Sequence, residues 1–191
     1  MSEKKLIKHL ESHLHALSER LELDPDADPV HAYVAGGVAV NYWTGHRMSD
    51  DVDLKWSHRV PIPPDMQTFE VPDKSAPIGW RLVTIDGGFA DSMGSFPPDW
   101  EQEAGEIARV GRFALHVISP LDLAVSKIAR FQDNDREDIR QLAAHGLLDP
   151  ERFEKRAMEA LDYYIGNTNF VMINLRDALK IVRKELDDPH P

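Results

Sequence analysis

Residues 34–40 have the sequence Val34-Ala35-Gly36-Gly37-Val38-Ala39-Val40, and residues 47–54 have the sequence Arg47-Met48-Ser49-Asp50-Asp51-Val52-Asp53-Leu54. In the first stretch, a glycine pair interrupts an apolar run. In the second, an extended backbone would place Asp51 and Asp53 on one face and the alternate apolar residues on the other. The two stretches therefore predict a tight turn before a helix, followed by a strand that carries paired carboxylates.

This pairing of glycines and carboxylates is suited to nucleotide chemistry. Two carboxylates held close together repel each other, and both stay ionised most easily around a cation. Mg²⁺ takes oxygen ligands and often shares them with substrate phosphates. Gly36 and Gly37 lack a Cβ atom, so backbone N–H groups can approach a phosphate at the start of a helix. We predict that Asp51 and Asp53 bind Mg²⁺, or Mn²⁺ in its place.

The same residues resemble a known superfamily. A glycine turn followed by Asp-x-Asp resembles the nucleotidyltransferases that include DNA polymerase beta. The segment from Arg47 to Asp53 is similar to the Arg-x-Thr/Ser-x-Asp-Ile-Asp run of AbiEii-like bacterial nucleotidyltransferases, which include toxins of toxin–antitoxin pairs. Downstream, residues 127–138 are similar to that group's Lys-x-x-Ala-x-x-Arg…Asp-x-x-Asp segment, with shorter internal spacing around Ala129. The whole chain resembles an uncharacterised branch of this group.

The resemblance implies roles for particular residues. A third carboxylate on a neighbouring strand often serves as the base, and Asp86 at the end of the predicted strand 81–86 fills this role, with Asp91 as the alternative. The implied metal ligands are Asp51, Asp53 and Asp86, and Lys127 joins them as the fourth catalytic residue. The implied nucleotide-binding residues are Gly36, Gly37, Arg47, Ser49, Lys127, Arg130 and Asp135. Without the family pattern, Lys127, Arg130 and Asp135 would simply be a salt-bridged helix surface.

The implied reaction is the transfer of a nucleoside monophosphate from a nucleoside triphosphate (NTP) to an acceptor hydroxyl. RNA such as a tRNA end, a protein and a small molecule all remain open as acceptors, and a toxin would bring a cognate antitoxin as its partner. One alternative is a non-catalytic nucleotide-binding member of regulatory or antitoxin type. Another is a ribonuclease, because Arg140 and His145 fit an Arg-x4-His pattern of some helical ribonucleases.

The periodicity of the apolar residues predicts an α+β fold with a helical C-terminal half. The resemblance implies a nucleotidyltransferase fold, with a small mixed sheet and flanking helices. We expect a catalytic core with an N-terminal helix at residues 1–119 and a helical region packed on it at residues 120–191. Strands are predicted at 31–35, 51–56, 68–71 (an edge strand), 81–86, 106–110 and 113–119. Helices are predicted at 6–21, 38–43, 121–131, 135–145, 151–164 and 169–186.

Composition limits the partners and the location. The 191 residues include 33 acidic and 22 basic ones, for a net charge of −11. This balance argues against broad binding of duplex DNA, which depends on a basic surface. The absence of cysteine excludes disulfides and thiolate metal sites. No apolar run approaches the roughly 20 residues that span a bilayer, so we expect a cytoplasmic location and no membrane partner.

Overall fold

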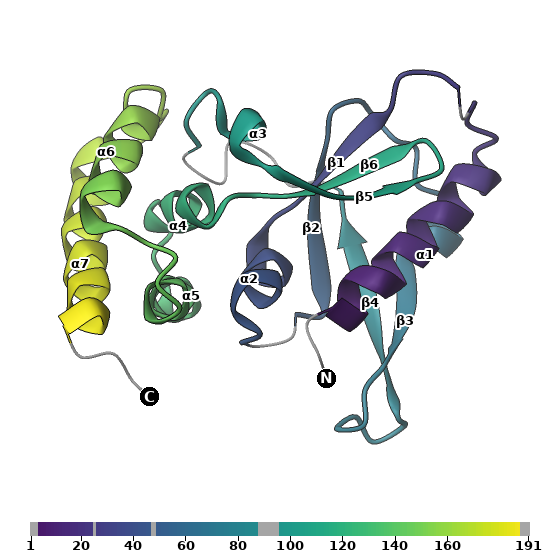
Figure 1. Ribbon diagram of the computed structural model, residues 1–191, viewed down its shortest axis with the longest axis horizontal. Coiled ribbons are helices and arrows are strands. Elements are labelled where there is room, and N and C mark those ends of the chain that lie inside the picture. Colours follow the sequence, from purple (N-terminus) through teal and green to yellow (C-terminus); the bar gives the residue numbers. More distant parts are fainter. Residues whose placement is uncertain (1–3, 25, 47–48, 88–95, 188–191) are drawn as a thin grey trace. The chain divides into compact units, whose positions relative to one another are not determined.

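The computed structural model describes residues 4–24, 26–46, 49–87 and 96–187 (Figure 1). Arg47 and Asp91, which the sequence analysis singles out, lie outside the described residues. The chain divides into two compact units. The sheet unit comprises the described residues up to 87 together with 104–117, and the helical unit comprises 96–103 and 118–187. Residues 96–103 therefore group with the helical unit, whereas the sequence analysis assigns them to the catalytic core at residues 1–119.

A six-stranded mixed sheet forms the first unit, in the order β3-β4-β2-β1-β6-β5 (Figure 1). Its strands are β1 (Val30–Val34), β2 (Asp51–Trp56), β3 (Thr68–Pro72), β4 (Trp80–Asp86), β5 (Gly105–Val110) and β6 (Phe113–Val117). Strand β2 pairs with β1 antiparallel and with β4 parallel, while β1 pairs with β6 parallel. The hairpins β3–β4 and β5–β6 complete the two edges. The central position of β2 puts the Asp-x-Asp segment in the middle of the sheet.

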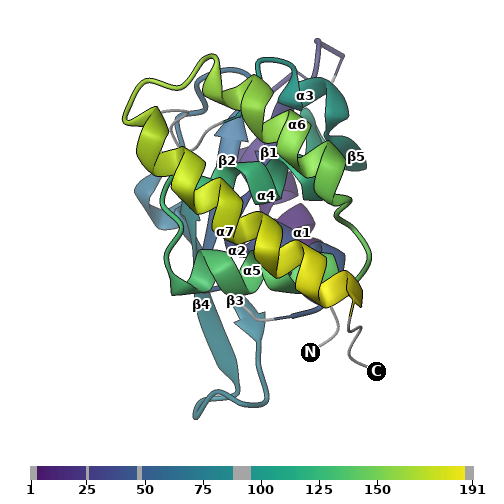
Figure 2. The same ribbon diagram turned by 90° about the vertical axis from the view of Figure 1, so that its left-hand side faces the viewer.

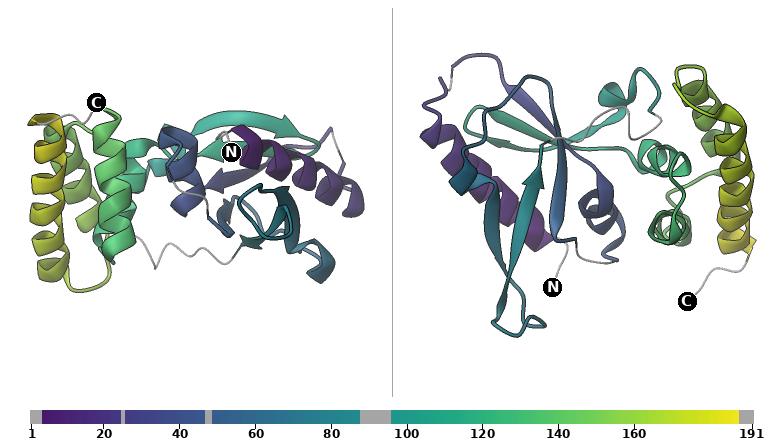
Figure 3. Two further views of the ribbon diagram at one scale, coloured as in Figure 1. Left: turned by 90° about the horizontal axis from the view of Figure 1, so that it is seen from below. Right: turned by 180° about the vertical axis from the view of Figure 1, so that it is seen from behind.

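Helix α1 (Lys4–Arg20) covers one face of this sheet. Its leucines at 6, 10, 14 and 17 are fully buried, because they form a single stripe at helical spacing. The ring of His13 stacks on Phe69 of β3 at a centroid distance of 5.0 Å. The helix crosses in front of β3 in Figure 1 and behind it in the opposite view on the right of Figure 3. The face that holds Phe69 is therefore the covered, apolar face.

Helix α2 (Gly36–Thr44) connects β1 to β2 and packs against β2 through a largely apolar segment. It ends at Gly45, whose left-handed backbone (φ 66°) suits a residue without a side chain. The short 3-10 helix η1 (Pro64–Met66) precedes β3. The sequence analysis predicted α2 two residues too short at its start, because it counted the glycines as a turn before the helix.

The helical unit contains α3 (Trp100–Glu103), α4 (Pro120–Ile128), α5 (Asp133–Ala144), α6 (Pro150–Leu161) and α7 (Thr168–Asp187). The long helix α7 packs against α4, α5 and α6, and Figure 2 shows it running the length of this unit. Side-chain caps fix two of the starts: Ser119 accepts from the backbone N–H of Asp122, and Asp149 accepts from that of Arg152. Gly146, in the left-handed region (φ 68°), follows the end of α5.

The structure confirms the α+β fold class and the predicted order of the longer elements. The sequence analysis missed α3 and η1, which have only four and three residues. Elements this short carry too little periodicity to be recognised. Among the described helices, none combines the length and the apolar character that a membrane crossing requires.

Candidate active site on the sheet unit

Strand β2 presents its two aspartates on the face opposite α1. Val52 and Leu54 are fully buried, whereas Asp51 is exposed and Asp53 is half-buried. This alternation is the pattern that the sequence predicts for a strand with one covered face. The two carboxylates therefore emerge on the same side of the sheet, opposite α1.

Strand β4 brings Asp86 beside them. In the parallel pairing of β2 with β4, Asp53 lies opposite Asp86 and Asp51 lies opposite Thr84. Paired residues of neighbouring strands point to the same face, and adjacent strands are about 4.8 Å apart. The register places the backbones of Asp53 and Asp86 side by side.

The other face of β4 confirms this orientation. Val83 and Ile85 are buried, and Val83 pairs with Phe69, the residue on which α1 rests. Asp86 and Thr84, which alternate with them, are exposed. The face opposite α1 thus carries Asp86, the predicted third acidic residue, together with Asp51 and Asp53.

Gly36 lies directly against Asp53. A Cβ atom added at Gly36 would overlap the carboxylate oxygen Oδ2 of Asp53, and the residue has a positive φ of 58°. The backbone N–H of Ala35 donates to the carbonyl oxygen of Asp53 at 3.0 Å, which fixes the turn to β2. Only glycine satisfies both the backbone conformation and the space. The glycine turn and the Asp-x-Asp strand are therefore parts of a single arrangement.

The start of α2 is suited to an anion. Ala35 is the residue before the first turn of α2, and its own side chain makes no capping hydrogen bond. The first N–H groups of a helix have no partner within the helix and favour negative charge. Gly37 lies in this first turn, and its contact with a phosphate stays a prediction.

Ser49 contacts Asp51 in the structure. Its buried hydroxyl donates to Oδ1 of Asp51 at 2.7 Å. The sequence analysis predicts a contact between Ser49 and a phosphate oxygen, whereas the observed hydrogen bond makes Ser49 a residue that orients a carboxylate.

The fit of the site to a metal is incomplete in the observed rotamers. Within the described residues, no group of three or more His, Asp or Glu side chains is gathered closely enough to hold a metal ion. The backbone positions of Asp51, Asp53 and Asp86 suit a shared cation, because all three carboxylates emerge on one face of two adjacent strands. Binding would require rotation of side chains, while Asp51 can keep its hydrogen bond with Ser49 and offer its other oxygen to a metal.

The predicted residues of the helical unit form an ion-pair cluster. The ammonium of Lys127 on α4 lies 2.7 Å from Oδ2 of Asp138 and 3.7 Å from Oδ1 of Asp135, both on α5. Arg130 forms a two-pronged contact with Asp135 at 2.8 and 2.7 Å. Lys127, Asp135 and Asp138 are all buried. The cluster joins α4 to α5, and Asp138 is a member to which the sequence analysis gave no role.

Asp135 is held ionised within this cluster. Burial alone would raise the pKa of its carboxyl, but the guanidinium of Arg130 and the backbone N–H of Gln132 outweigh burial and keep the pKa below its ordinary value. The hydrogen bond from Gln132 also forms half of the capping box at the start of α5. Asp135 therefore stabilises the helical unit whatever else it contacts.

The ribonuclease pair is engaged in helix contacts. Arg140 forms a two-pronged ion pair with Glu137 at 2.8 and 2.6 Å and lies 3.7 Å from Glu185. Nδ1 of His145 lies 2.8 Å from the carbonyl oxygen of Gln141, at the end of α5. These contacts give both residues structural roles on α5.

Sequence reasoning missed polar residues that lie on the same face as the carboxylates, two of which, Tyr33 and His116, are buried. Tyr33 of β1 pairs with Lys55 of β2 on one side and with His116 of β6 on the other. Lys55 follows Asp53 by two positions, so these side chains share the face of the carboxylates. Nδ1 of His31 lies 2.8 Å from Nε2 of His116, and burial, aided by the nearby His31, lowers the pKa of His116. The alternation of His31 and Tyr33 along β1 is the sequence pattern that could have indicated these residues.

A helix that begins at a glycine turn, followed by an Asp-x-Asp strand with a third aspartate on its parallel neighbour, is the arrangement of a nucleotidyltransferase fold. The family model described as "Nucleotidyltransferase of unknown function (DUF6036)" matches residues 12–182, and the chain belongs to this family. No curated protein matches the chain. The more specific relationship to AbiEii-like proteins stays a prediction.

Proposed function

We propose that the chain is a Mg²⁺-dependent nucleotidyltransferase that transfers a nucleoside monophosphate from an NTP to an acceptor hydroxyl. The observation that carries this proposal is the register of β2 and β4, which sets Asp53 beside Asp86 on the face that also bears Asp51. The close approach of Gly36 to Asp53 supports it, since it links the phosphate-binding turn to the carboxylates.

In the proposed reaction, the acceptor oxygen forms a bond to the α-phosphorus. The bond from that phosphorus to the bridging oxygen of the β-phosphate breaks, and pyrophosphate leaves with the electron pair. Asp86 takes the proton from the acceptor hydroxyl, and the N–H groups at the start of α2 hold the phosphates. Bound Mg²⁺, or Mn²⁺, would stabilise the charge on the attacking and leaving oxygens.

Lys127 has a narrower role in this proposal than the resemblance alone implies. Its ammonium is already paired with Asp138 at 2.7 Å and is buried in the helical unit. A phosphate contact requires this ion pair to be shared or opened, with Asp135 and Arg130 keeping the cluster in place. The acceptor stays open among RNA, protein and small molecules, and a toxin role with a cognate antitoxin is the more specific form of the proposal.

The test is a transfer assay with the full chain. Each of the four NTPs, labelled at the α-phosphate, is incubated with Mg²⁺ and with total RNA, total protein or hydroxyl-bearing small molecules. We expect label to appear in one acceptor class and to require the metal. The matched control is Asp65→Asn, which changes an exposed aspartate on η1, away from the carboxylate face.

The assay also addresses the non-catalytic alternative. The transferase proposal is supported if wild type and Asp65→Asn are active while Asp53→Asn and Asp86→Asn are inactive. NTP binding by wild type without transfer to any acceptor, and equal binding by Asp86→Asn, would instead favour a nucleotide-binding member without catalysis.

A further inference from the structure

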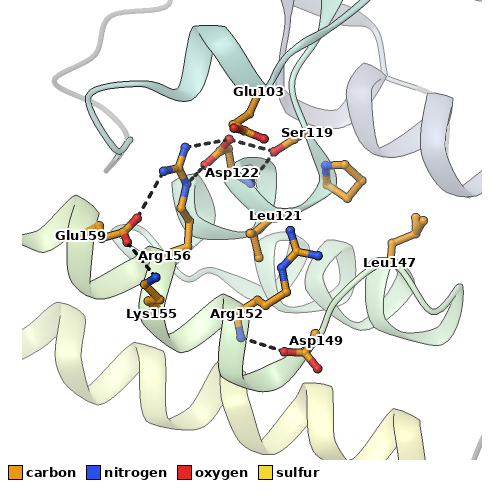
Figure 4. Close-up of a pocket in the computed structure, with 11 residues that line it drawn as sticks. Glu103, Ser119, Leu121, Asp122, Leu147, Asp149, Arg152, Lys155, Arg156 and Glu159 are labelled. Atoms are coloured by element: carbon orange, nitrogen blue, oxygen red, sulfur yellow. Dashed lines mark hydrogen bonds and ion pairs between the residues drawn. The ribbon is translucent and has the colours of Figure 1, made fainter.

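The helical unit contains a pocket of about 390 Å³ that the proposed reaction does not use. It lies among the end of α3, the start of α4 and one side of α6 (Figure 4). The residues that line it are Glu103, Ser119, Pro120, Leu121, Asp122, Leu147, Asp149, Arg152, Lys155, Arg156 and Glu159. A volume of this size suits a small molecule.

One side of the pocket is a closed ion-pair network around Arg156. Its guanidinium donates to Asp122 at 2.7 Å, to Asp99 at 2.7 Å and to Glu159 at 3.3 Å. The buried carboxylate of Asp122 also accepts from the hydroxyl of Ser119 at 2.8 Å. Burial would lower the pKa of Arg156, but Asp122 and the other carboxylates outweigh it and raise that pKa. On this side one guanidinium is shared among three carboxylates, and Glu159 also lies 4.0 Å from the ammonium of Lys155, so each of these charged groups has a partner.

The other side presents two charges of opposite sign. Arg152 and Glu103 are both exposed to solvent, and among the described residues neither forms an ion pair within 4.0 Å. Figure 4 shows both side chains at the pocket with no interaction drawn to either charged group. Acidic residues outnumber basic ones by 33 to 22, so a shortage of carboxylates does not explain an unpaired arginine.

Two leucines add apolar surface to the pocket. Leu121 of α4 and Leu147, which follows α5, are half-buried and line the pocket on either side of Arg152 in Figure 4. Asp149 is already engaged as the cap of α6, accepting from the backbone N–H of Arg152 at 2.8 Å. The unmatched features of the pocket are thus one cation, one anion and an apolar patch.

We infer that this pocket binds a small zwitterion of the amino-acid class. The carboxylate of the ligand pairs with Arg152, its ammonium pairs with Glu103, and its apolar part rests on Leu121 and Leu147. A simple anion would leave Glu103 without a partner, and a simple amine would leave Arg152 without one. Only a ligand with both charges matches both groups, and charge-assisted contacts of this kind are the stronger ones.

The test compares three molecules that share one apolar body. L-Leucine carries both charges, 4-methylpentanoate lacks the ammonium, and 3-methylbutylamine lacks the carboxylate. The fourth probe, 6-aminohexanoate, spans a longer separation of charges. Binding to the full chain is measured by calorimetry. We expect one of the two zwitterions to bind about tenfold or more tightly than either singly charged analogue.

Variants assign the binding to the pocket. Arg152→Gln and Glu103→Gln are each expected to weaken the zwitterion about tenfold or more, with unchanged melting temperatures in the absence of ligand. The matched control is Arg176→Gln, an exposed arginine of α7 outside the pocket, and it should bind as wild type does.

Three results would overturn the inference. They are binding of 4-methylpentanoate as tight as that of the zwitterions, absence of binding by both zwitterions, and binding that survives both pocket variants. The transfer assay with Asp86→Asn reports on the sheet unit alone, so failure of this inference is distinguishable from failure of the proposed function.

Discussion

The acidic residues of the sheet unit and those of the helical unit are arranged differently. On the sheet, the register sets the backbones of Asp53 and Asp86 side by side on one face. In the helical unit, Lys127 lies between Asp135 and Asp138, so that each carboxylate has a cation. Acidic residues that share one face of adjacent strands suit a metal, whereas a matched buried cluster holds helices together. The same residue type thus indicates a ligand in one unit and structural support in the other.

Removal of Lys127 should have the largest effect on stability. Lys127→Met leaves Asp138 buried without its cation, and we expect a loss of about 3–5 kcal/mol in the free energy of unfolding. Urea denaturation measures this loss. The double variant Lys127→Met/Asp138→Leu should recover much of it, because no unpaired charge remains. A stability loss below about 1 kcal/mol for Lys127→Met would remove the contrast between the two units.

On the sheet, the largest effect should fall on activity. Asp53→Asn and Asp86→Asn are each expected to lower transfer by about a hundredfold or more, because loss of a metal ligand costs at least as much as loss of its supporting groups. The melting temperature in the absence of ligand should stay the same or rise, because repulsion is relieved. A marked fall in the melting temperature of either variant would show that the aspartate is structural, as in the helical unit.

Gly36 offers an intermediate test within the sheet unit. Gly36→Ala forces a side chain into the left-handed region and against the carboxylate of Asp53. We expect a loss of about 1–3 kcal/mol in the free energy of unfolding, measured in urea. Gly45→Ala, which also replaces a glycine with positive φ next to α2, controls for backbone strain alone. Transfer activity should fall further in Gly36→Ala than in Gly45→Ala.

The smallest effect concerns acid stability of the helical cluster. The pKa of Asp135 is lowered in the folded state, so its contribution is fully present above the unfolded value of about 3.9 and is lost as the pH falls toward the folded value. Arg130→Gln should weaken this dependence between about pH 5 and the folded pKa. Urea midpoints measured over this range should converge for wild type and variant at the acid end. An unchanged difference would show that Arg130 acts through packing.

How far the sequence predicts the site depends on how far apart in the sequence the residues of each contact are. The shared face of Asp51 and Asp53 follows from alternation along one strand and is predictable. The choice of Asp86 rested on the resemblance, and its pairing with Asp53 depends on the register of β2 against β4, which joins segments more than thirty residues apart. The contact of Ser49 with Asp51 depends on rotamers that a one-dimensional pattern does not specify.

The helical unit shows the same limit. The pattern indicates that Lys127 and Asp138 belong to helix surfaces, but their burial follows from the packing of α4 against α5. Sequence spacing alone suggested an exposed salt bridge. Because α4 packs against α5, Lys127 and Asp138 are buried although their spacing is typical of an exposed helix surface.

The double pairing of β2 has a consequence for hydrogen exchange. Strand β2 bonds to β1 on one edge and to β4 on the other, so its backbone amides exchange with solvent only when a large part of the sheet opens. The carboxylates therefore stand on one of the slowest-exchanging segments expected in the sheet unit. Any adjustment to a bound nucleotide must come from side-chain rotation on the scale of nanoseconds, while the backbone beneath keeps its positions over far longer times.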